Sequence, residues 1–329
     1  MRLAICLFKF FHYGGLARDF LNITKICIAR GYSVTVYAME WYGDIPSDLN
    51  VKILPAKGWQ NHLRTKSFIE EVQIELRDKE FDLVIGFNKM PSLDIYYAAD
   101  PCYKEKTLGW NRFFYRMGGR YKYYSYCENA VFSKDSKTVS LMISKMQIAV
   151  FKKFYQTPDE RMVLLPPGVS KDRISPQNAT EIRADFREAN NVAVDEKILL
   201  MVGSSFKTKG LDRALKAMAL LPKKLRELVK LFVVGEGDIA YYKKMANRFN
   251  LQNNVVFFGG RDDVPLFLVG ADLLLQPSYW ENTGTVIIEA LISGLPVLAS
   301  DVCGYAYHIK QAGAGKLVPS PFDIKQFAD

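Results

Sequence analysis

Residues 272–300 read DLLLQPSYWENTGTVIIEALISGLPVLAS, and this stretch decides the fold class. It contains an apolar strand candidate at 273–276, a polar turn, an apolar helix candidate from Thr285 and a second strand candidate at 297–300. Buried strands joined through a helix are typical of a parallel sheet that helices cover on both faces. The stretch therefore predicts an α/β fold.

The same alternation continues on both sides of this stretch and passes through the chain twice. Pro, Gly and Ser cluster between the two series at 164–178 (LLPPGVSKDRISPQN), as they do at domain boundaries. We therefore predict two Rossmann-like domains, residues 1–166 and 167–329, whose ligands bind at the carboxyl ends of the strands. The candidate strands are 3–8, 33–37, 81–87, 138–143, 162–165, 197–202, 231–234, 255–258, 273–276 and 297–300, and the candidate helices are 15–30, 211–221, 241–249 and 285–293.

Composition argues against several classes of protein. No run of about 18 apolar residues could span a bilayer, and the opening MRLAICLFKFF predicts a buried strand and not a signal peptide. The five cysteines form no CxxC pair and there are three histidines, so we expect neither a disulfide framework nor a bound metal, in keeping with a reducing cytoplasm. The formal charge of +9 indicates an anionic partner, which could be nucleic acid, a membrane surface or a phosphorylated substrate.

Two glutamates flank the start of the candidate helix at 285–293. Glu281 lies in the loop before it and Glu289 about one turn inside, and the turn residues Asn282, Thr283 and Gly284 lie between them. Free amides and the helix dipole favour an anion at a helix start, and carboxylates accept hydrogen bonds from sugar hydroxyls. The pattern indicates a phosphorylated sugar ligand. The alternative is a surface glutamate followed by a helix with an incidental glutamate.

Two glycine-containing loops are further candidates for a phosphate site. In VGSSFKTKGLD at 202–212, Lys209 precedes Gly210 at a helix start, where a lysine can neutralise a diphosphate and glycine lets the backbone approach it. A solvated, charged turn is the alternative. Near the N-terminus, Gly14 and Gly15 open a helix without the GxGxxG spacing of nicotinamide binding, and a plain tight turn explains them equally well.

Asp100 is a candidate catalytic residue of the first half. It ends an apolar segment that follows a strand, so it is expected to lie at the carboxyl edge of the sheet. Its carboxylate could steady positive charge on a transferred sugar or orient an acceptor hydroxyl. An aspartate that caps the turn before Pro101 is the alternative.

The segment 104–134 concentrates cations and aromatic rings, opposed by only Glu105 and Glu128. Cations attract anionic lipid headgroups and Trp and Tyr settle in the interfacial layer; Arg beside aromatic rings also suits single-stranded nucleic acid. Part of the aromatic set is expected to be core. Because no RNA-binding or helix-turn-helix signature accompanies the segment, a membrane surface is favoured and nucleic acid is not expected. The expected membrane contacts are Lys104, Trp110, Arg112, Phe113, Arg116, Arg120 and Lys122.

The phrase at 277–300 (PSYWENTGTVIIEALISGLPVLAS) resembles the E-x7-E signature of retaining glycosyltransferases with the GT-B architecture. That resemblance implies that Glu281 contacts the transferred sugar and that Glu289 holds the ribose of the nucleotide. The family has an arginine where this chain has Ser204, so Lys207 or Arg173 is expected to supply the missing charge. The remaining donor-binding residues that it implies are Gly15, Lys209, Asn282, Thr283 and Gly284.

A wider resemblance, to the lipopolysaccharide core glucosyltransferases of the WaaG type, is carried by LFKFFHYGGLARDF (7–20), GFNKMPSLDIYYAAD (86–100), KFYQTPDERMVLLPPG (153–168), ADLLLQPSYWENTGTVIIEA (271–290) and VCGYAYHI (302–309). It implies two Rossmann-like domains that face each other across a cleft. It also implies transfer of glucose from UDP-glucose, with retention and without a metal or other cofactor, to a heptose of the inner core. The implied place of action is the cytoplasmic face of an anionic inner membrane. Asp19 and Asp100 are expected to act with Glu281 as catalytic residues around the acceptor.

The chain stops at PFDIKQFAD (321–329), where the proteins that it resembles continue for several helices. If the chain ends there, we expect weaker domain closure and lower activity. Three other functions stay open at this point. They are transfer of a different hexose from a UDP-sugar, epimerisation of a UDP-sugar without an acceptor, and a noncatalytic membrane- or RNA-binding role on the same fold.

Overall fold

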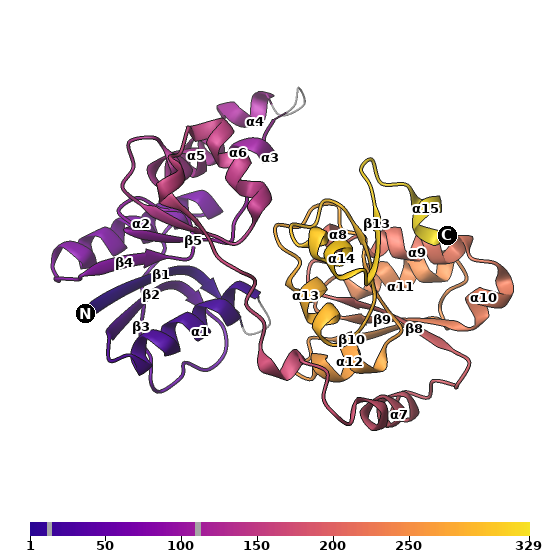
Figure 1. Ribbon diagram of the computed structural model, residues 1–329. Coiled ribbons are helices and arrows are strands. Elements are labelled where there is room, and N and C mark those ends of the chain that lie inside the picture. The colour runs from indigo at the N-terminus through magenta and orange to yellow at the C-terminus, as the bar shows by residue number, and fades with distance from the viewer. Residues whose placement is uncertain (12–14, 109–112) are drawn as a thin grey trace. The chain divides into compact units, whose positions relative to one another are not determined.

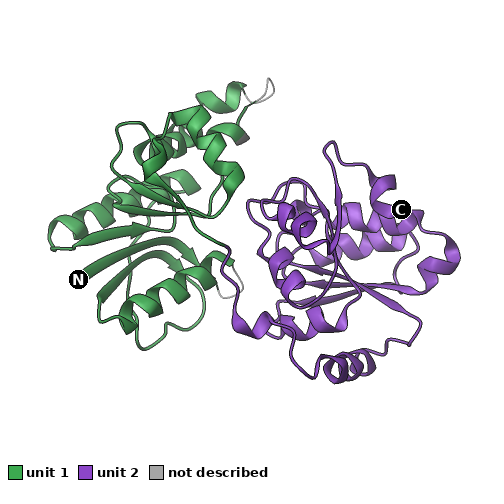
Figure 2. Ribbon diagram, viewed as in Figure 1, with its two compact units in different colours: residues 1–166 green, residues 167–329 purple. Residues whose placement is uncertain are grey.

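The computed structural model describes residues 1–11, 15–108 and 113–329 (Figure 1). These residues form two compact units, Met1–Pro166 and Pro167–Asp329 (Figure 2). Each unit is a parallel sheet with helices on both of its faces (Figure 1). The predicted α/β architecture is therefore confirmed.

The sheet of the first unit has the strand order β3-β2-β1-β4-β5-β6-β7 within the part of the chain that the structure describes. All its neighbouring strands run parallel. The strands are β1 (Arg2–Phe10), β2 (Ser33–Trp41), β3 (Asn50–Ile53), β4 (Leu83–Gly86), β5 (Ile95–Ala98), β6 (Val139–Met142) and β7 (Met162–Leu164).

Alternate side chains of β1 face opposite sides of this sheet, as a strand requires. Leu3, Ile5 and Leu7 pack into the core that α1 covers, and Ala4 and Cys6 pack into the core beneath α2, α5 and α6. Both faces are buried, which explains why β1 reads as one continuous apolar run. The helices are α1 (Gly15–Ala29), α2 (Asn61–Arg77), α3 (Tyr103–Lys106), α4 (Phe113–Met117), α5 (Gly119–Phe132), α6 (Lys145–Tyr155) and the 3₁₀ turn η2 (Asp159–Arg161).

The sheet of the second unit has the order β10-β9-β8-β11-β12-β13, again with all neighbouring strands parallel. Its strands are β8 (Lys197–Val202), β9 (Val229–Val234), β10 (Val255–Gly259), β11 (Leu273–Gln276), β12 (Val297–Ser300) and β13 (Gly315–Val318). One core lies beneath α7, α12, α13 and α14, and the other beneath α9, α11 and α15. The helices are α7 (Ala179–Ala189), α8 (Phe206–Lys209), α9 (Leu211–Leu220), α10 (Lys223–Glu227), α11 (Ile239–Arg248), α12 (Val264–Gly270), α13 (Thr285–Ile292), α14 (Ala306–Ala312), α15 (Ile324–Ala328) and the 3₁₀ turn η3 (Lys171–Arg173).

Two arginines of α7 attach this helix to the sheet. Arg183 donates to the carbonyls of residues 269–271 and to Asp272, and Arg187 donates to Asp272 at 3.1 Å. Burial by itself raises the pKa of Asp272, but the Ile198 amide and the two guanidinium groups outweigh it and hold that pKa below its ordinary value. The carboxylate is therefore ionised at neutral pH and anchors α7.

The sequence pattern missed three strands, β3, β5 and β13. β5 is a central strand of only four residues, too short for a clear periodic signal. β3 and β13 each lie at an edge of their sheet, and most of their side chains are exposed or half-buried. An edge strand of four residues buries too little surface to need a continuous apolar run, so the hydrophobic pattern contains no signal for it.

A buried carboxylate, Glu128 of α5, holds the start of α3 in place. It forms an ion pair with Lys89 and accepts hydrogen bonds from the amides of Tyr103 (2.6 Å) and Lys104 (3.1 Å) and from the Tyr155 hydroxyl (2.7 Å). Burial by itself raises the pKa of Glu128, yet Lys89 and these donors outweigh it and lower that pKa below 4.5. The negative charge is thus fully compensated inside the core.

We predict that Glu128→Gln lowers the free energy of unfolding by about 3 kcal/mol at pH 7, because it leaves the Lys89 ammonium buried without its carboxylate. Since the folded pKa of Glu128 lies below 4.5, the difference from wild type persists above pH 4.5 and narrows as the pH falls through that folded pKa. Urea unfolding followed by circular dichroism measures both.

Glu75→Gln is the matched control, because Glu75 makes its pairs with Lys52 and Lys79 on a more exposed surface. We expect it to cost less than about 1 kcal/mol. Equal costs for the two variants would contradict the anchoring role of Glu128.

Candidate functional site

The strand order of the second sheet reverses between β8 and β11. β9 and β10 extend the sheet beyond β8, and β12 and β13 extend it beyond β11. Ligands of open parallel sheets bind outside the carboxyl ends of the strands at such a switch point. The loop after β8 carries Lys209 and the loop after β11 carries Glu281, so the topology brings together two of the residues predicted from sequence.

Lys209 and Glu281 form an ion pair although they lie 72 residues apart in the sequence. Both side chains are mostly buried, with exposed fractions of 20% and 15%. The stem of Lys209 lies over Gly203, where a Cβ would come within 2.9 Å of the lysine Cε. Gly203 therefore provides the space through which Lys209 reaches Glu281.

The loop that carries Glu281 is also held by the segment after β12. The Gly304 amide donates to the Glu281 carbonyl at 3.2 Å, and the Tyr305 amide donates to the Thr283 carbonyl at 2.8 Å. Burial, together with the nearby Glu281 carboxylate, raises the pKa of the Cys303 thiol to about 12, so Cys303 stays a neutral packing residue. The sequence analysis assigned no role to this segment, although its position after a strand candidate was the available signal.

The start of α13 lies beside this loop. Gly284 caps the helix in the left-handed conformation, with φ of +79°, and no side chain caps it. Asn282 and Glu289 are buried on either side of this start, with exposed fractions of 7% and 5%. The predicted helix and its boundary at Thr285 are confirmed, and the helix start is suited to an anion.

Gly210 brings the two loops into backbone contact. It caps α9 with φ of +77°, and a Cβ there would overlap the Pro277 carbonyl oxygen. Next to this contact, the Tyr279 amide donates to the Thr208 carbonyl at 2.9 Å. Only glycine satisfies both the left-handed conformation and the close approach.

Arg173 was predicted as a substitute for the missing charge at the donor. Its carbonyl accepts a hydrogen bond from Ser293, at the C-terminal end of α13. Its side chain is 10% exposed, and Nε and Nη1 are buried without a hydrogen-bond partner among the residues that the structure describes. The Asp172 carboxylate lies 3.7 Å from Nε. Arg173 also lines an apolar cavity of about 550 Å³, and its donor contact stays a prediction.

In the first sheet the strand order reverses between β1 and β4. Gly15 opens α1 after β1, and a Cβ there would meet no atom within 4 Å, so a ligand could approach its backbone. The carboxylate of Asp19, also on α1, accepts a hydrogen bond from the Tyr97 hydroxyl at 2.8 Å. Gly14 lies outside the described residues.

Asp100 follows β5 and is half-buried. Asn88 follows β4, and its side-chain Nδ2 lies 3.5 Å from the Asp100 carboxylate. Its side-chain Oδ1 accepts a hydrogen bond from the Phe8 amide of β1 at 2.8 Å. Asp19, Asn88 and Asp100 therefore all belong to segments at or after the carboxyl ends of β1, β4 and β5, as a ligand site of a parallel sheet requires.

Part of the basic and aromatic segment belongs to the core: Phe132 is fully buried, and Tyr123 packs against the same core. Tyr103, Tyr115 and Tyr121 are half-buried; the hydroxyls of Tyr103 and Tyr115 lie 2.6 Å apart, and the rings of Tyr103 and Tyr121 stack. Lys104 is half-buried, and its ammonium lies 4.1 Å from the ring centroid of the buried Tyr155, so its membrane contact stays a prediction.

The rest of the segment presents apolar side chains beside cations. Phe113, Phe114 and Met117 are exposed by 56%, 82% and 63%, and Arg120 and Lys122 are exposed nearby. Two further predicted membrane contacts, Trp110 and Arg112, lie outside the described residues. No helix within the described ranges is long and apolar enough to cross a membrane.

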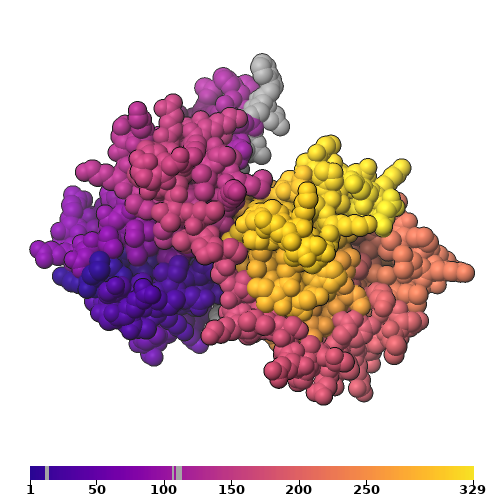
Figure 3. All heavy atoms as spheres, in the orientation of Figure 1, coloured from indigo at the N-terminus to yellow at the C-terminus, as the bar shows by residue number. Residues whose placement is uncertain are grey.

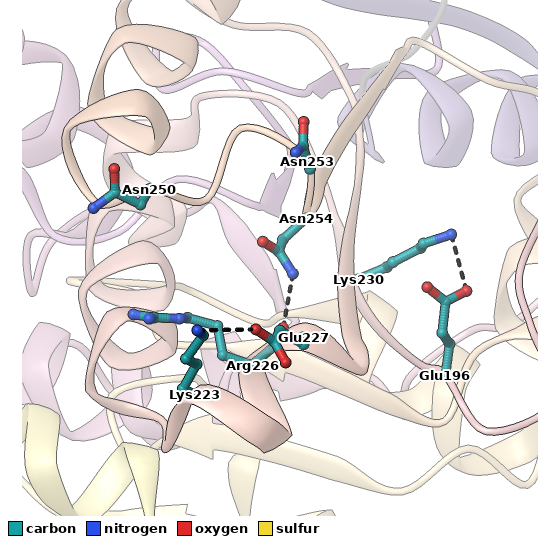
Figure 4. A pocket seen from close by; sticks show the side chains of 8 residues that line it. All are labelled: Glu196, Lys223, Arg226, Glu227, Lys230, Asn250, Asn253 and Asn254. Atoms are coloured by element: carbon teal, nitrogen blue, oxygen red, sulfur yellow. Dashed lines mark hydrogen bonds and ion pairs between the residues drawn. The ribbon is translucent and has the colours of Figure 1, made fainter.

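A second cavity, of about 420 Å³, lies at the amino ends of β8, β9 and β10 (Figure 4). Its charges are paired with one another: Lys230 lies 2.9 Å from Glu196, and Lys223 lies 3.9 Å from Glu227. Asn254 donates to two backbone carbonyls. Because these groups satisfy one another at the end of the sheet opposite to Lys209, we assign this cavity no ligand.

Comparison with known proteins identifies relatives of this chain. Residues 182–329 match the family described as glycosyl transferases group 1. The chain is 42% identical over 326 residues to the lipopolysaccharide glucosyltransferase WaaG of Escherichia coli K12, covering 99% of this chain and 87% of that protein. The crystal structure of WaaG, a glycosyltransferase involved in lipopolysaccharide biosynthesis, superimposes with a TM-score of 0.94 and 42% identity over 99% of this chain and 88% of that one. Anabaena Alr3699/HepE in complex with UDP and glucose shares the fold, with a TM-score of 0.73 and 17% identity over 100% of this chain and 88% of that one.

We predict that Gly210→Ala lowers the free energy of unfolding of the second unit by about 3 kcal/mol, because the new Cβ adds an overlap with the Pro277 carbonyl to the strain of a positive φ. Gly294→Ala is the control, since Gly294 has φ of +80° with open space around it and should cost about 1 kcal/mol. Thermal unfolding of both variants measures the difference. A Gly210 variant no less stable than the Gly294 variant would show that the two loops do not touch there.

Proposed function

This chain belongs to the family of the lipopolysaccharide glucosyltransferase WaaG and is a glycosyltransferase with the GT-B fold, and on that premise we propose that it transfers glucose from UDP-glucose to a heptose of the lipopolysaccharide inner core. The observation that carries the proposal is the pairing of Lys209 with Glu281 at the switch point of the second sheet. Lys209 supplies a cation that suits a diphosphate, and Glu281 supplies a carboxylate that suits sugar hydroxyls. The two side chains are in direct contact as an ion pair.

In the proposed donor site, three charged residues bind different parts of the UDP-sugar. Lys209 binds the diphosphate together with the amides at the start of α13, Glu281 accepts hydrogen bonds from the sugar hydroxyls, and Glu289 holds the ribose. Lys209 and Glu281 form an ion pair in the structure. The arriving diphosphate takes over Lys209, and the released Glu281 carboxylate then turns to the sugar.

The proposed reaction proceeds with retention and needs no metal. The bond between the sugar C1 and the phosphate oxygen breaks, and the acceptor hydroxyl oxygen bonds to C1 on the same face. The acceptor proton passes to the departing phosphate oxygen. Lys209 and the helix start supply the positive charge that stabilises the leaving diphosphate, so we expect chelation by EDTA to leave the rate unchanged.

The first unit is the proposed acceptor domain. Asp19 and Asp100 both lie near the carboxyl ends of parallel strands, where an acceptor hydroxyl would bind. The hydrogen bond from Tyr97 fixes the Asp19 carboxylate on α1. We propose that Asp100 orients the acceptor hydroxyl or steadies positive charge on the sugar.

The proposed place of action is the cytoplasmic face of an anionic inner membrane. A heptose of the lipopolysaccharide core is attached to a lipid, so the enzyme must work near a bilayer surface. The exposed Phe113, Phe114 and Met117 can enter the interfacial layer, while Arg116, Arg120 and Lys122 attract anionic headgroups. We propose no nucleic acid partner for this segment.

The test of this function is UDP release from UDP-glucose with and without core lipopolysaccharide that carries the heptose. We expect release that depends on the acceptor, and Glu281→Gln should reduce it at least about 100-fold, because the variant removes a charge aimed at the reacting sugar. Release with another UDP-sugar would identify a different hexosyltransferase. Conversion of the donor without acceptor would indicate an epimerase, and wild-type activity in Glu281→Gln would contradict the assigned role.

We further predict that Glu281→Gln tightens the binding of UDP itself by about tenfold, although it abolishes transfer, because Lys209 no longer has a competing carboxylate. Lys209→Met should weaken UDP by a similar factor. Isothermal titration calorimetry measures both dissociation constants.

The control for this prediction is Glu196→Gln, which removes the partner of Lys230 in the cavity of Figure 4. This pair is about as exposed as that of Lys209 and Glu281, with 21% and 18% against 20% and 15%. UDP affinity should not change in the control. Unchanged affinity in Glu281→Gln would show that the ion pair does not compete with the diphosphate.

For the membrane surface, we predict that Phe114→Ser and Arg120→Gln each reduce partitioning to anionic lipid vesicles about fivefold, as loss of one interfacial contact worth about 1 kcal/mol requires. Vesicle co-sedimentation at low and high salt measures it. Val194→Ser, which changes an apolar residue exposed by 97% on the second unit, should have no effect. Equal binding to zwitterionic vesicles would argue against an electrostatic contribution.

A further inference from the structure

Arg213, in the first turn of α9, connects the two loops of the proposed donor site. Its guanidinium donates to the carbonyls of Pro277 at 3.1 Å and Ser278 at 2.8 Å. Its Cζ lies 3.6 Å from the ring centroid of Tyr279 and 4.1 Å from that of Phe322. The guanidinium therefore has an aromatic contact on two sides and carbonyl acceptors at its edge. We call Arg213, Tyr279 and Phe322 the donor clamp.

We infer that Arg213 is a positioning residue for a nucleoside diphosphate sugar, because it holds the loop of Lys209 against the loop of Glu281. This inference rests on the proposed function. Lys209 lies four residues before Arg213, and Glu281 lies three residues after Ser278. The clamp thus acts within a few residues of both charged groups without being one of them.

The chemistry of the clamp requires arginine. A guanidinium is planar and carries its N–H groups at the edge, so it can stack on aromatic rings and donate to carbonyls at the same time. A lysine ammonium in its place keeps the charge but loses the planar stack and the fork of donors. Substitution of Arg213 by Lys therefore removes the geometry of the clamp and keeps its charge.

Tyr279 shows how closely the two loops are joined. Its amide donates to the Thr208 carbonyl at 2.9 Å, its hydroxyl donates to Asp212 at 2.8 Å, and its ring lies on Arg213. Asp212 in turn accepts from Lys216 at 3.0 Å. The three contacts of Tyr279 join it to residues 208–213, and the pairing of Lys216 with Asp212 supports one of them.

Phe322 extends the clamp to the C-terminal segment. Ser320 donates to Asp301, after β12, through its amide at 3.0 Å and its hydroxyl at 2.7 Å, and Phe322 then reaches the face of Arg213. The following helix, α15, packs against α9, and the end of the chain is exposed on the surface of the second unit (yellow in Figure 3). The segment that precedes α15 therefore covers Arg213 from the side opposite to Tyr279.

The clamp affects the affinity for the donor. A ligand that binds two loops loses binding free energy if it must also order those loops. With the clamp intact, the two segments hold Lys209 and Glu281 side by side. Without it, the donor itself must hold the loops together, so its dissociation constant rises. A residue that only stabilised the fold would instead lower the melting temperature and leave the affinity of the folded molecules unchanged.

The experiment measures the Kd of UDP by calorimetry, the KM and kcat for UDP-glucose, and the melting temperature for Arg213→Lys and Phe322→Leu. We expect Arg213→Lys to raise Kd and KM about tenfold and to change kcat less than threefold, and Phe322→Leu to raise Kd about threefold. A Kd for Arg213→Lys within twofold of wild type would overturn the inference. If that variant does not fold, Phe322→Leu decides in the same way.

Arg183→Lys is the matched control. Arg183 also binds backbone carbonyls and a carboxylate in the second unit, but it joins α7 to the end of α12 and does not touch the donor loops. It should lower the melting temperature without changing the Kd of UDP. An equal rise of Kd in Arg183→Lys would mean that any loss of stability weakens UDP, and the inference would fail.

Lys209→Met separates failure of this inference from failure of the proposed function. Weaker UDP binding in Lys209→Met together with wild-type affinity in Arg213→Lys would leave the donor site in place and reject the clamp. Wild-type affinity in Lys209→Met would reject the donor site itself, and the role of Arg213 with it.

Discussion

The parallel pairing of β8 with β11 is the constraint on which the candidate site depends. Leu199 and Leu200 pair with Leu273 and Leu274, although more than 70 residues separate the strands. Because all the strands of the sheet run the same way, the loops that follow these two strands emerge at the same edge. Lys209 and Glu281 meet for this reason. The strand order makes the position between β8 and β11 a switch point.

The meeting of opposite charges also stabilises the site. A lysine and a glutamate that are mostly buried would each lose solvation, and their pairing offsets part of that cost. Gly203 and Gly210 let the backbones and the lysine stem approach closely, and Arg213 joins the carbonyls of the opposite loop. These contacts hold the charged groups of the two segments in one place.

In the first unit a single buried carboxylate has a comparable role. Glu128 binds the start of α3 through two amides, and its partner Lys89 also donates to the Pro101 carbonyl at 2.6 Å. Pro101 follows Asp100, so the same ion pair holds the turn of the proposed acceptor residue and the beginning of the basic segment.

The sequence by itself determined the α/β class, most strand positions, the helix that starts at Thr285 and the placing of Glu281 and Glu289 around that start, because hydrophobic periodicity and helix-capping chemistry are local. It did not reveal the four-residue central strand β5, or the short edge strands β3 and β13, whose side chains are largely exposed. Only the tertiary structure decided that Lys209 pairs with Glu281, that Glu128 is a buried anchor and that Arg213 joins two loops. These contacts depend on which strands become neighbours, and strand order in a parallel sheet comes from packing between distant segments, for which a local pattern has no signal.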